Sequence, residues 1–515
     1  MTAVIEWRAL APVLLVLVAA ILGILAEAVV PKAQRFFAQV FLTVASTVAA
    51  GVFLVANWRA GLGGPVAMGS MMLDGPTYFM WGALLVFGLA AILVFAERQL
   101  NGGVSAFAAS VATVPGSRAE AEASAARLEH TEVFPLALFA LGGMMVFPAS
   151  ADLITMFVAL EVFSLPLYLM CGMARRRRLL SQEAALKYFL LGAFSSAFFL
   201  FGVALLYGYA GSFNLNAIAD AVQNPTMGNG ILIAGMAMLG IGLLFKIGVV
   251  PFHNWTPDVY MGAPTPVTGF MAICTKLAAV GATLRVFYVA LAGERWSWQP
   301  MLAVLIVATM LIGAVWGLTQ TDIKRTLAYS SIAHAGFIMT AVVGASTGSP
   351  TSPLDSVASA MFYLVVYGLA SIGAFAVITM VRNASGEANT IDSWSGLGRK
   401  NPLLASIFAL FMLSFTGIPL TGGFIGKWAV FTAAWRGGFS WLVIVAVLLS
   451  LVAAVFYLRI IVVMFFGEPA DGVVVGKASA FTWLPIAVAA VGVAALGVFP
   501  GPVLDLATVA GTFLR

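Results

Sequence analysis

Long apolar runs recur along nearly the whole chain, separated by short polar stretches. Each run holds about 20 residues, which is the length that an α-helix needs to cross a bilayer core. The apolar positions are continuous rather than alternating, and lipid admits only helices or closed barrels, so the pattern predicts helices. The class is therefore an all-α polytopic membrane protein with about 14 spans, at approximately 9–30, 35–57, 78–96, 133–149, 152–173, 184–209, 229–249, 265–290, 299–320, 325–344, 356–381, 402–435, 440–466 and 480–512.

The composition excludes a soluble protein. The chain has 515 residues, of which 62% are hydrophobic and 9% charged, whereas roughly a quarter of the residues of an average soluble domain are charged. Cys171 and Cys274 lie in different apolar runs, and the sequence has no CxxC motif or Cys/His cluster. An iron–sulfur or zinc site within this chain is therefore not expected.

The basic residues are distributed unevenly between the two sides of the predicted spans. About 15 Lys and Arg, among them Arg175–Arg178 and Lys324, fall in the odd-to-even loops, and about five fall on the other side. Because Lys and Arg are retained on the cytoplasmic side, both termini should face outward. The run of four arginines is then a topology anchor, or alternatively a site for anionic lipid headgroups. Residues 103–132 form the sizeable polar loop on the cytoplasmic side.

Several ionisable residues lie inside the apolar runs, where each should face the bundle interior and have a partner. Lys276 is at mid-span, and Glu161 and Lys427 are similarly placed, so these residues predict a proton relay. The others could be relay members or structural ion pairs. The full set is Glu161, Lys187, Lys246, Lys276, Arg285, His334, Lys427 and Arg459.

Two spans are interrupted by proline. The seventh runs from Lys246 through Pro251 to His253, and the twelfth has Pro419 among glycines before Lys427. Proline removes a helical hydrogen bond, and freed backbone groups at membrane depth indicate a protein-lined or wet cavity. The breaks lie five spans apart, which predicts two inverted five-helix repeats, each with a discontinuous helix. In this division residues 1–132 precede repeats at 133–290 and 299–466, and 480–515 form the last span.

Five segments carry a family resemblance that extends over nearly the whole chain. They are LEVFSLPLYL, EAALKYFLLGAFSSAFFLFG, GIGLLFKIGVVPFHNWTPDVYMGAPTPVTGF, QTDIKRTLAYSSIAHAGF and GIPLTGGFIGKW. In these segments the sequence resembles the N-type antiporter-like subunits of bacterial respiratory complex I, the proton-translocating NADH–quinone oxidoreductase. The resemblance implies a Glu161–Lys246 pair in a first half-channel, Lys276 and His334 on a central axis, Lys427 in a second half-channel, and a further family lysine at Lys187.

The resemblance also implies what the rest of the complex supplies. FMN, iron–sulfur clusters, NADH and quinone would be bound by other subunits, with neighbouring antiporter-like and small membrane subunits as partners in the bacterial plasma membrane. Nucleic acid is not an expected partner. The alternatives are a subunit of a multi-subunit Na⁺/H⁺ antiporter, a scaffold whose buried charges fix helix packing, and, remotely, a haem protein using His253 and His334.

Overall fold

The computed structural model describes residues 6–225, 227–345 and 355–514. Within these ranges, 12 helices are long and apolar enough to cross a membrane, and two shorter apolar helices begin at Val133 and Pro402. Together they match the fourteen predicted spans in order. The expectation of an all-α polytopic membrane protein is therefore confirmed.

The first half of the chain contains the polar loop and the first interrupted span. Thr265–Ala290 is one continuous span, in which α11 and α12 are joined by a π-helical turn at Met271–Thr275. The helices are α1 (Trp7–Val29), α2 (Lys32–Arg59), α3 (Gly75–Phe95), α4 (Arg118–Ala125), α5 (Val133–Ala149), α6 (Leu153–Cys171), α7 (Arg178–Ala210), α8 (Leu215–Gln223), α9 (Gly230–Ile247), α10 (Trp255–Gly262), α11 (Thr265–Phe270) and α12 (Lys276–Arg285).

The second half repeats the alternation of long and interrupted spans. The predicted last span, 480–512, is shorter than expected: α20 ends at Val498 and a separate helix starts at Gly501, because Pro500 and Pro502 interrupt the chain there. The helices are α13 (Arg295–Leu318), α14 (Ile323–Val343), α15 (Ser356–Met380), α16 (Leu397–Lys400), α17 (Pro402–Thr416), α18 (Gly422–Arg436), α19 (Ser440–Phe466), α20 (Ala480–Val498) and α21 (Gly501–Val509).

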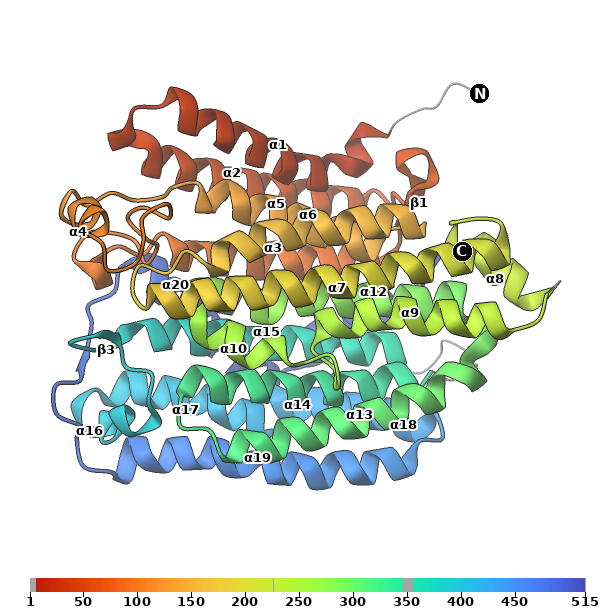
Figure 1. Ribbon diagram of the computed structural model, residues 1–515. Coiled ribbons are helices and arrows are strands. Elements are labelled where there is room, and N and C mark those ends of the chain that lie inside the picture. The colour runs from red at the N-terminus through yellow and green to blue at the C-terminus, as the bar shows by residue number, and fades with distance from the viewer. Residues whose placement is uncertain (1–5, 226, 346–354, 515) are drawn as a thin grey trace.

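Short antiparallel strands close the two ends of the bundle. One hairpin pairs β1 (Gly64–Val66) with β2 (Met71–Leu73). At the other end, β3 (Val381–Asn383) lies between β4 (Gly386–Glu387) and β5 (Val474–Val475). In Figure 1, β3, α4 and α16 lie together at the left end, whereas β1 and α8 lie at the right.

Both ends of the described chain lie at the end of the bundle that carries the β1–β2 hairpin. The Asn57 side chain donates to the Arg8 carbonyl at 2.8 Å, and the Leu514 N–H donates to Asp74, which precedes α3, at 3.3 Å. This arrangement agrees with an even number of spans.

Three spans form the interior of the bundle. The most apolar windows of Thr265–Ala290 and α14 are 100% buried, and that of α15 is 89% buried. The outer helices expose large apolar residues, as expected for lipid-facing or subunit-facing surfaces. In Figure 1, α1 and α2 lie along one edge of the bundle and α19 along the opposite edge. Ionisable residues on the interior spans are thus far from lipid.

The two interrupted spans end their first halves in the same way. Gly248 follows α9 with φ +85°, and Gly417 follows α17 with φ +83°. At each break the next residue's N–H returns to the helix, from Val249 to Leu244 and from Ile418 to Leu413. This is a Schellman cap, which glycine favours because its φ is positive. Glycine therefore ends each half-helix, and the predicted break residues Pro251 and Pro419 lie just beyond it.

Candidate functional site

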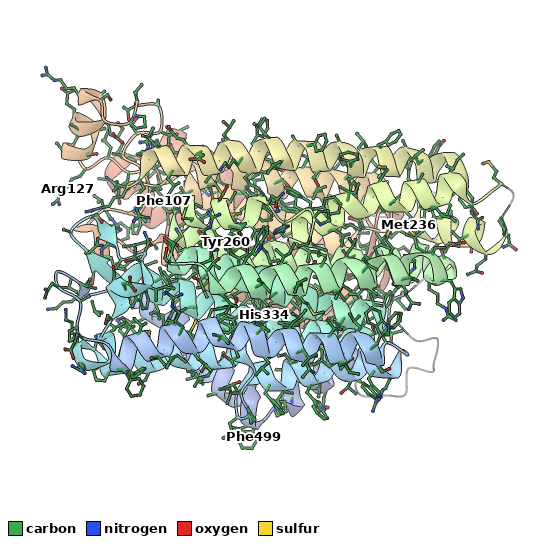
Figure 2. All side chains as sticks on the ribbon, turned by 60° about the horizontal axis from the view of Figure 1, so that its bottom comes forward. Phe107, Arg127, Met236, Tyr260, His334 and Phe499 are labelled. Atoms are coloured by element: carbon green, nitrogen blue, oxygen red, sulfur yellow. The ribbon has the colours of Figure 1, made fainter. Side chains whose placement is uncertain are left out.

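Four ionisable side chains lie buried in the interior, on helices from both halves of the chain. Lys246 on α9, Lys276 on α12, His334 on α14 and Lys427 on α18 are between 2% and 6% exposed. His334 lies near the middle of the bundle, whereas Arg127 lies at one end (Figure 2). We refer to these four residues as the buried row.

Lys246 is surrounded by aromatic rings. Its Nζ lies 5.3 to 5.7 Å from the ring centroids of Phe163, Tyr168, Tyr188 and Phe245 and donates to the Tyr168 hydroxyl at 3.4 Å. Rings at this distance stabilise an ammonium group through their quadrupoles, and more so when it is desolvated. The residues of α6, α7 and α9 therefore form a cage for a cation.

Glu161 lies two helical turns before Tyr168 on α6, on the same face of that helix. Its carboxylate interacts electrostatically with Lys246, but no ion pair joins the two within the described residues. One carboxylate oxygen, Oε1, is buried and has no hydrogen-bond partner in the described part of the chain. The pair implied by the family resemblance is thus open in this structure, because the aromatic cage and not the acid holds the lysine.

Lys276 contacts the end of the first interrupted helix. Its Nζ donates to the carbonyl of Ile247, the last residue of α9, at 3.1 Å, and to the Ser331 carbonyl at 2.8 Å. It also lies 5.7 Å from the centre of the Tyr367 ring. The last carbonyls of a helix carry partial negative charge, so α9 stabilises the Lys276 cation directly beside Lys246.

His334 lies between two tyrosine hydroxyls. Its Nδ1 is 2.7 Å from the Tyr363 hydroxyl on α15, and its Nε2 is 3.2 Å from the Tyr457 hydroxyl on α19. The rings of Tyr367 and Phe415 lie 5.0 and 5.3 Å from the imidazole. Tyr367 therefore contacts both Lys276 and His334 and connects the two.

Lys427 occupies the end of the second interrupted helix. Its Nζ donates to the carbonyls of Phe415 and Thr416 on α17 at 3.0 and 2.8 Å, and to the Ser450 hydroxyl on α19 at 2.7 Å. The Phe415 ring also lies against His334, so this one residue contacts both His334 and Lys427. Lys276 and Lys427 thus occupy matching places, each at the C-terminal end of a broken half-helix. Such ends bind cations in transporters with discontinuous helices.

The row has the chemistry of a proton relay. Among the residues that the structure describes, no acid lies within ion-pair distance of its three lysines, and their Nζ atoms bond to neutral oxygens. Amines, an imidazole and hydroxyls can each accept and release a proton. Such groups, placed one after another in the interior, have the chemistry to pass a proton between them.

Two predicted residues lie outside the row. The Lys187 side chain on α7 is 41% exposed and pairs with Glu183 and Asp258, each at 2.7 Å. Asp258 on α10 also pairs with Arg325. His253 lies in the first break, where its buried Nδ1 has no partner. Lys187 is thus part of an ion-pair network that ties α7 to α10.

Lys324 lies in a helix and not, as predicted, in a loop between two spans. It is 3% exposed, and its Nζ donates to the Ala263 carbonyl at the end of α10 at 2.7 Å. The sequence placed it between spans, but α14 already begins at Ile323. Lys324 therefore resembles Lys276 and Lys427 in occupying the end of a half-helix.

The tyrosines that contact the buried row were not predicted from the sequence. Tyr363 and Tyr367 are four residues apart on α15, as are Ser330 and His334 on α14. Residues at this spacing share a helix face. Two polar residues four positions apart within an apolar run could therefore have indicated a polar face directed into the bundle.

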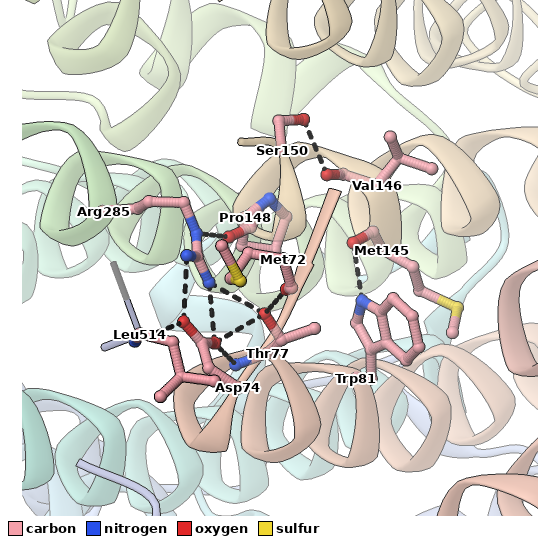
Figure 3. A network of polar contacts seen from close by, with 10 residues as sticks. All are labelled: Met72, Asp74, Thr77, Trp81, Met145, Val146, Pro148, Ser150, Arg285 and Leu514. Carbon is pink, nitrogen blue, oxygen red and sulfur yellow. Dashed lines mark hydrogen bonds and ion pairs between the residues drawn. The ribbon is translucent and has the colours of Figure 1, made fainter. Parts of the chain in front are cut away.

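Arg285 belongs to a different network, shown in Figure 3. Its guanidinium binds both carboxylate oxygens of Asp74, at 3.0 and 2.8 Å, and the Thr77 hydroxyl at 2.8 Å. It also donates to the Pro148 carbonyl. The network joins α3, α5 and α12, and Asp74 accepts from the Leu514 N–H as well. Arg285 thus has the ion-pair partner that the structural alternative for this residue requires.

The described residues contain no group of three or more His, Cys, Asp or Glu that could hold a metal ion. Cys171 and Cys274 are buried and unpaired by disulfide.

Comparison with known proteins places the chain in a family. Residues 150–453 match the family described as NADH:quinone oxidoreductase/Mrp antiporter, transmembrane. NADH-quinone oxidoreductase subunit N of Nocardioides sp. is 54% identical, with 99% of each chain covered. The protein of the same name from Rhodococcus opacus is 52% identical over 99% of this chain and 97% of its own.

Solved structures agree in fold. A chain of respiratory complex I from Thermus thermophilus with bound aureothin has a TM-score of 0.77 at 32% identity, covering 97% of this chain and 100% of that one. A chain of the Mrp complex from Dietzia sp. has a TM-score of 0.79 at 22% identity, covering 98% and 96%; this shows a shared fold alone. The family expected from the sequence is thus confirmed, and the chain belongs to the N-subunit family of NADH-quinone oxidoreductases.

Proposed function

We propose that this chain is a proton-translocating subunit of an NADH–quinone oxidoreductase, in which the buried row carries the proton. The observation that supports this most is the continuity of the row. Lys246 adjoins Ile247, whose carbonyl binds Lys276. Tyr367 then contacts Lys276 and His334, and Phe415 contacts His334 and Lys427. Ionisable groups at this depth are costly and usually mark an ion pathway.

Glu161 is the control element in this proposal. In the cage, Lys246 lies among aromatic rings and makes no ion pair with Glu161 among the described residues. When Glu161 approaches, it adds a counter-charge that favours the protonated lysine; when it withdraws, Lys246 can release its proton toward Lys276. The unpartnered Glu161 oxygen supports this role, since no competing hydrogen bond holds it in place.

The two interrupted helices would hold corresponding halves of the pathway. Their identical glycine caps, and a lysine at each capped end, support a division into repeats at 133–290 and 299–466. Lys187 would act at the edge of the first repeat by fixing α10 through Asp258, and His253 would be accessory. Pro251 and Pro419 would keep the half-helices from rejoining.

The orientation follows from the uneven distribution of Lys and Arg. In a bacterial plasma membrane, the end of the bundle with Arg175–Arg178 would face the cytoplasm and both termini would face outward. FMN, iron–sulfur clusters, NADH and quinone would be bound by other subunits, and neighbouring antiporter-like subunits would flank this chain. Sodium–proton antiport is the second candidate, but it rests on a shared fold at 22% identity.

The test compares two substitutions of Glu161 in the assembled complex. Glu161→Gln keeps the shape but removes the charge, whereas Glu161→Asp keeps the charge with a shorter reach. We expect Gln to reduce proton pumping more than Asp in vesicles containing matched amounts of complex. Glu468, whose side chain is 87% exposed, provides the matched control, and its Gln and Asp variants should both pump normally.

Three other outcomes would contradict this role for Glu161 or favour an alternative function. If the Gln variant pumps normally while the Asp variant is disabled, packing and not charge is the role of Glu161. Pumping that follows a sodium gradient without NADH oxidation would favour the antiporter. Normal pumping by both Glu161 variants and by Lys246→Ala would support the scaffold alternative.

A further inference from the structure

A polar cavity of about 60 Å³ lies at the end of the bundle that carries β3. It is enclosed by the loop between α6 and α7, the junction of α10 and α11, the start of α14 and the β3–β4 hairpin. Its cationic lining comprises Arg175, Arg176, Arg177, Lys324 and Arg382. We call it the basic cavity. It is separate from the buried row, and nothing in the proposed proton pathway requires it.

Positive charge exceeds negative charge in the lining of the basic cavity. Five cations line it against one carboxylate, Glu387, whose Oε2 accepts from the Thr265 hydroxyl. None of the five makes an ion pair among the described residues. Their hydrogen bonds go to neutral groups: Arg175 to the carbonyls of residues 105 and 128, Arg176 to that of residue 384, Lys324 to that of residue 263, and Arg382 to the carbonyl of residue 379 and the side-chain oxygen of residue 101.

Two of these cations, Arg175 and Arg382, are partly withdrawn from water, whereas Arg176 is exposed. Burial lowers the pKa of Arg382, and the neighbouring Arg176 charge lowers it further against the opposing effect of Glu387. Burial also lowers the pKa of Arg175. Gathering five like charges around one small cavity costs free energy that a bound anion would return. The five cations come from three separate segments of the chain, at 175–177, 324 and 382.

We propose that the basic cavity binds a phosphate group. Guanidinium groups match phosphate oxygens geometrically and form charge-assisted, often bidentate hydrogen bonds. The Arg176 side chain reaches the β3–β4 hairpin, where it donates to the Ala384 carbonyl at 3.4 Å. The same hairpin carries Arg382, so both guanidinium groups can contact one phosphate. Basic pockets between membrane helices bind lipid headgroups in this way, and soluble phosphate has the same chemistry. The ligand is therefore an anionic phospholipid headgroup or free phosphate.

The experiment uses the assembled complex in lipid nanodiscs. Spin-labelled phosphatidylglycerol and phosphatidylcholine are compared for retention at the protein, with and without inorganic phosphate as competitor. The test variant is Arg176→Gln with Arg382→Gln. The control is Arg399→Gln with Lys400→Gln, which removes two charges from α16 at the same end of the bundle (Figure 1). At about fivefold per basic residue, the test variant should bind phosphatidylglycerol about 30-fold more weakly.

A second variant tests the basic cavity without replacing a buried residue. Ser385 is exposed at the mouth of the basic cavity, so Ser385→Glu should leave the fold intact and repel an anion, reducing retention at least about fivefold. Loss in both cavity variants, with the control unchanged and phosphate ineffective, assigns a lipid. Direct binding of inorganic phosphate, lost in the same variants, assigns free phosphate. Equal loss in the control, or no loss in Ser385→Glu, overturns the proposal.

Discussion

Replacing Arg285 should destabilise the protein without disabling proton transfer. Arg285 is 2% exposed at its side chain and Asp74 is fully buried. Arg285→Met preserves much of the apolar volume but leaves the Asp74 carboxylate buried beside Thr77 without its counter-charge. The defect is therefore an uncompensated buried anion at the junction of α3, α5 and α12 (Figure 3).

The size of the effect follows from the geometry. Removing one partner of a buried pair costs about 3–5 kcal/mol, which corresponds to roughly two to four orders of magnitude in the unfolding equilibrium. Adding Asp74→Asn removes the stranded charge while keeping an Asx side chain at the N-cap of α3. The double variant should therefore regain most of the loss and retain a deficit of about 1–2 kcal/mol for the unpaired polar groups.

The free energy of unfolding is measured for the parent, Arg285→Met and the double variant, each as the purified chain in mild detergent. Arg59→Met, at an exposed position, is the control, and its free energy of unfolding should change by no more than about 0.5 kcal/mol. Protons pumped per electron are measured in parallel on matched amounts of assembled complex. A structural role for Arg285 is refuted if the Arg285→Met variant is as stable as the parent but pumps poorly, because Arg285 would then belong to the proton pathway. It is also refuted if Asp74→Asn fails to restore stability.

Two further predictions concern the second break and the polar loop. Gly417→Ala should slow NADH-driven pumping more than Pro419→Ala. A Cβ on Gly417 would lie 2.9 Å from Lys427 Cδ, and a residue with a side chain costs about 1–2 kcal/mol in the left-handed backbone conformation. Equal pumping rates in the two variants would contradict this. Arg178→Ala should raise hydrogen–deuterium exchange in the loop at 103–132, since Arg178 donates to three of its carbonyls; unchanged exchange would show that other contacts hold the loop.

The sequence was sufficient for the spans and for the charged members of the row. An ionisable residue in a continuous apolar run is conspicuous, because its cost in lipid is large. Lys246, Lys276, His334 and Lys427 are all of this kind, and all are buried. The same rule could not separate Arg285 from them, because a structural ion pair leaves the same signal along the chain.

The partners of these residues depend on packing between distant segments and could not be predicted. The cage around Lys246 combines Phe163, Tyr168, Tyr188 and Phe245 from three helices, and an aromatic residue in an apolar run carries no distinctive signal. Lys324 was misassigned for a related reason. It lies at the edge of a run, and only the tertiary position of α10 shows that its Nζ is covered.

The lack of acids beside the row bears on how a proton could be driven along it. A helix end stabilises a cation by about 0.3–2 kcal/mol, whereas a carboxylate at about 4 Å contributes about 4 kcal/mol at an effective dielectric constant near 20. Small shifts of α9 or α17 would therefore change the charge state of Lys276 or Lys427 only modestly. Movement of one carboxylate toward the row would outweigh them. Glu161 has a buried oxygen with no hydrogen-bond partner among the described residues. In the proposed pathway the switch is therefore assigned to this acid, and proton conduction to the three lysines and His334.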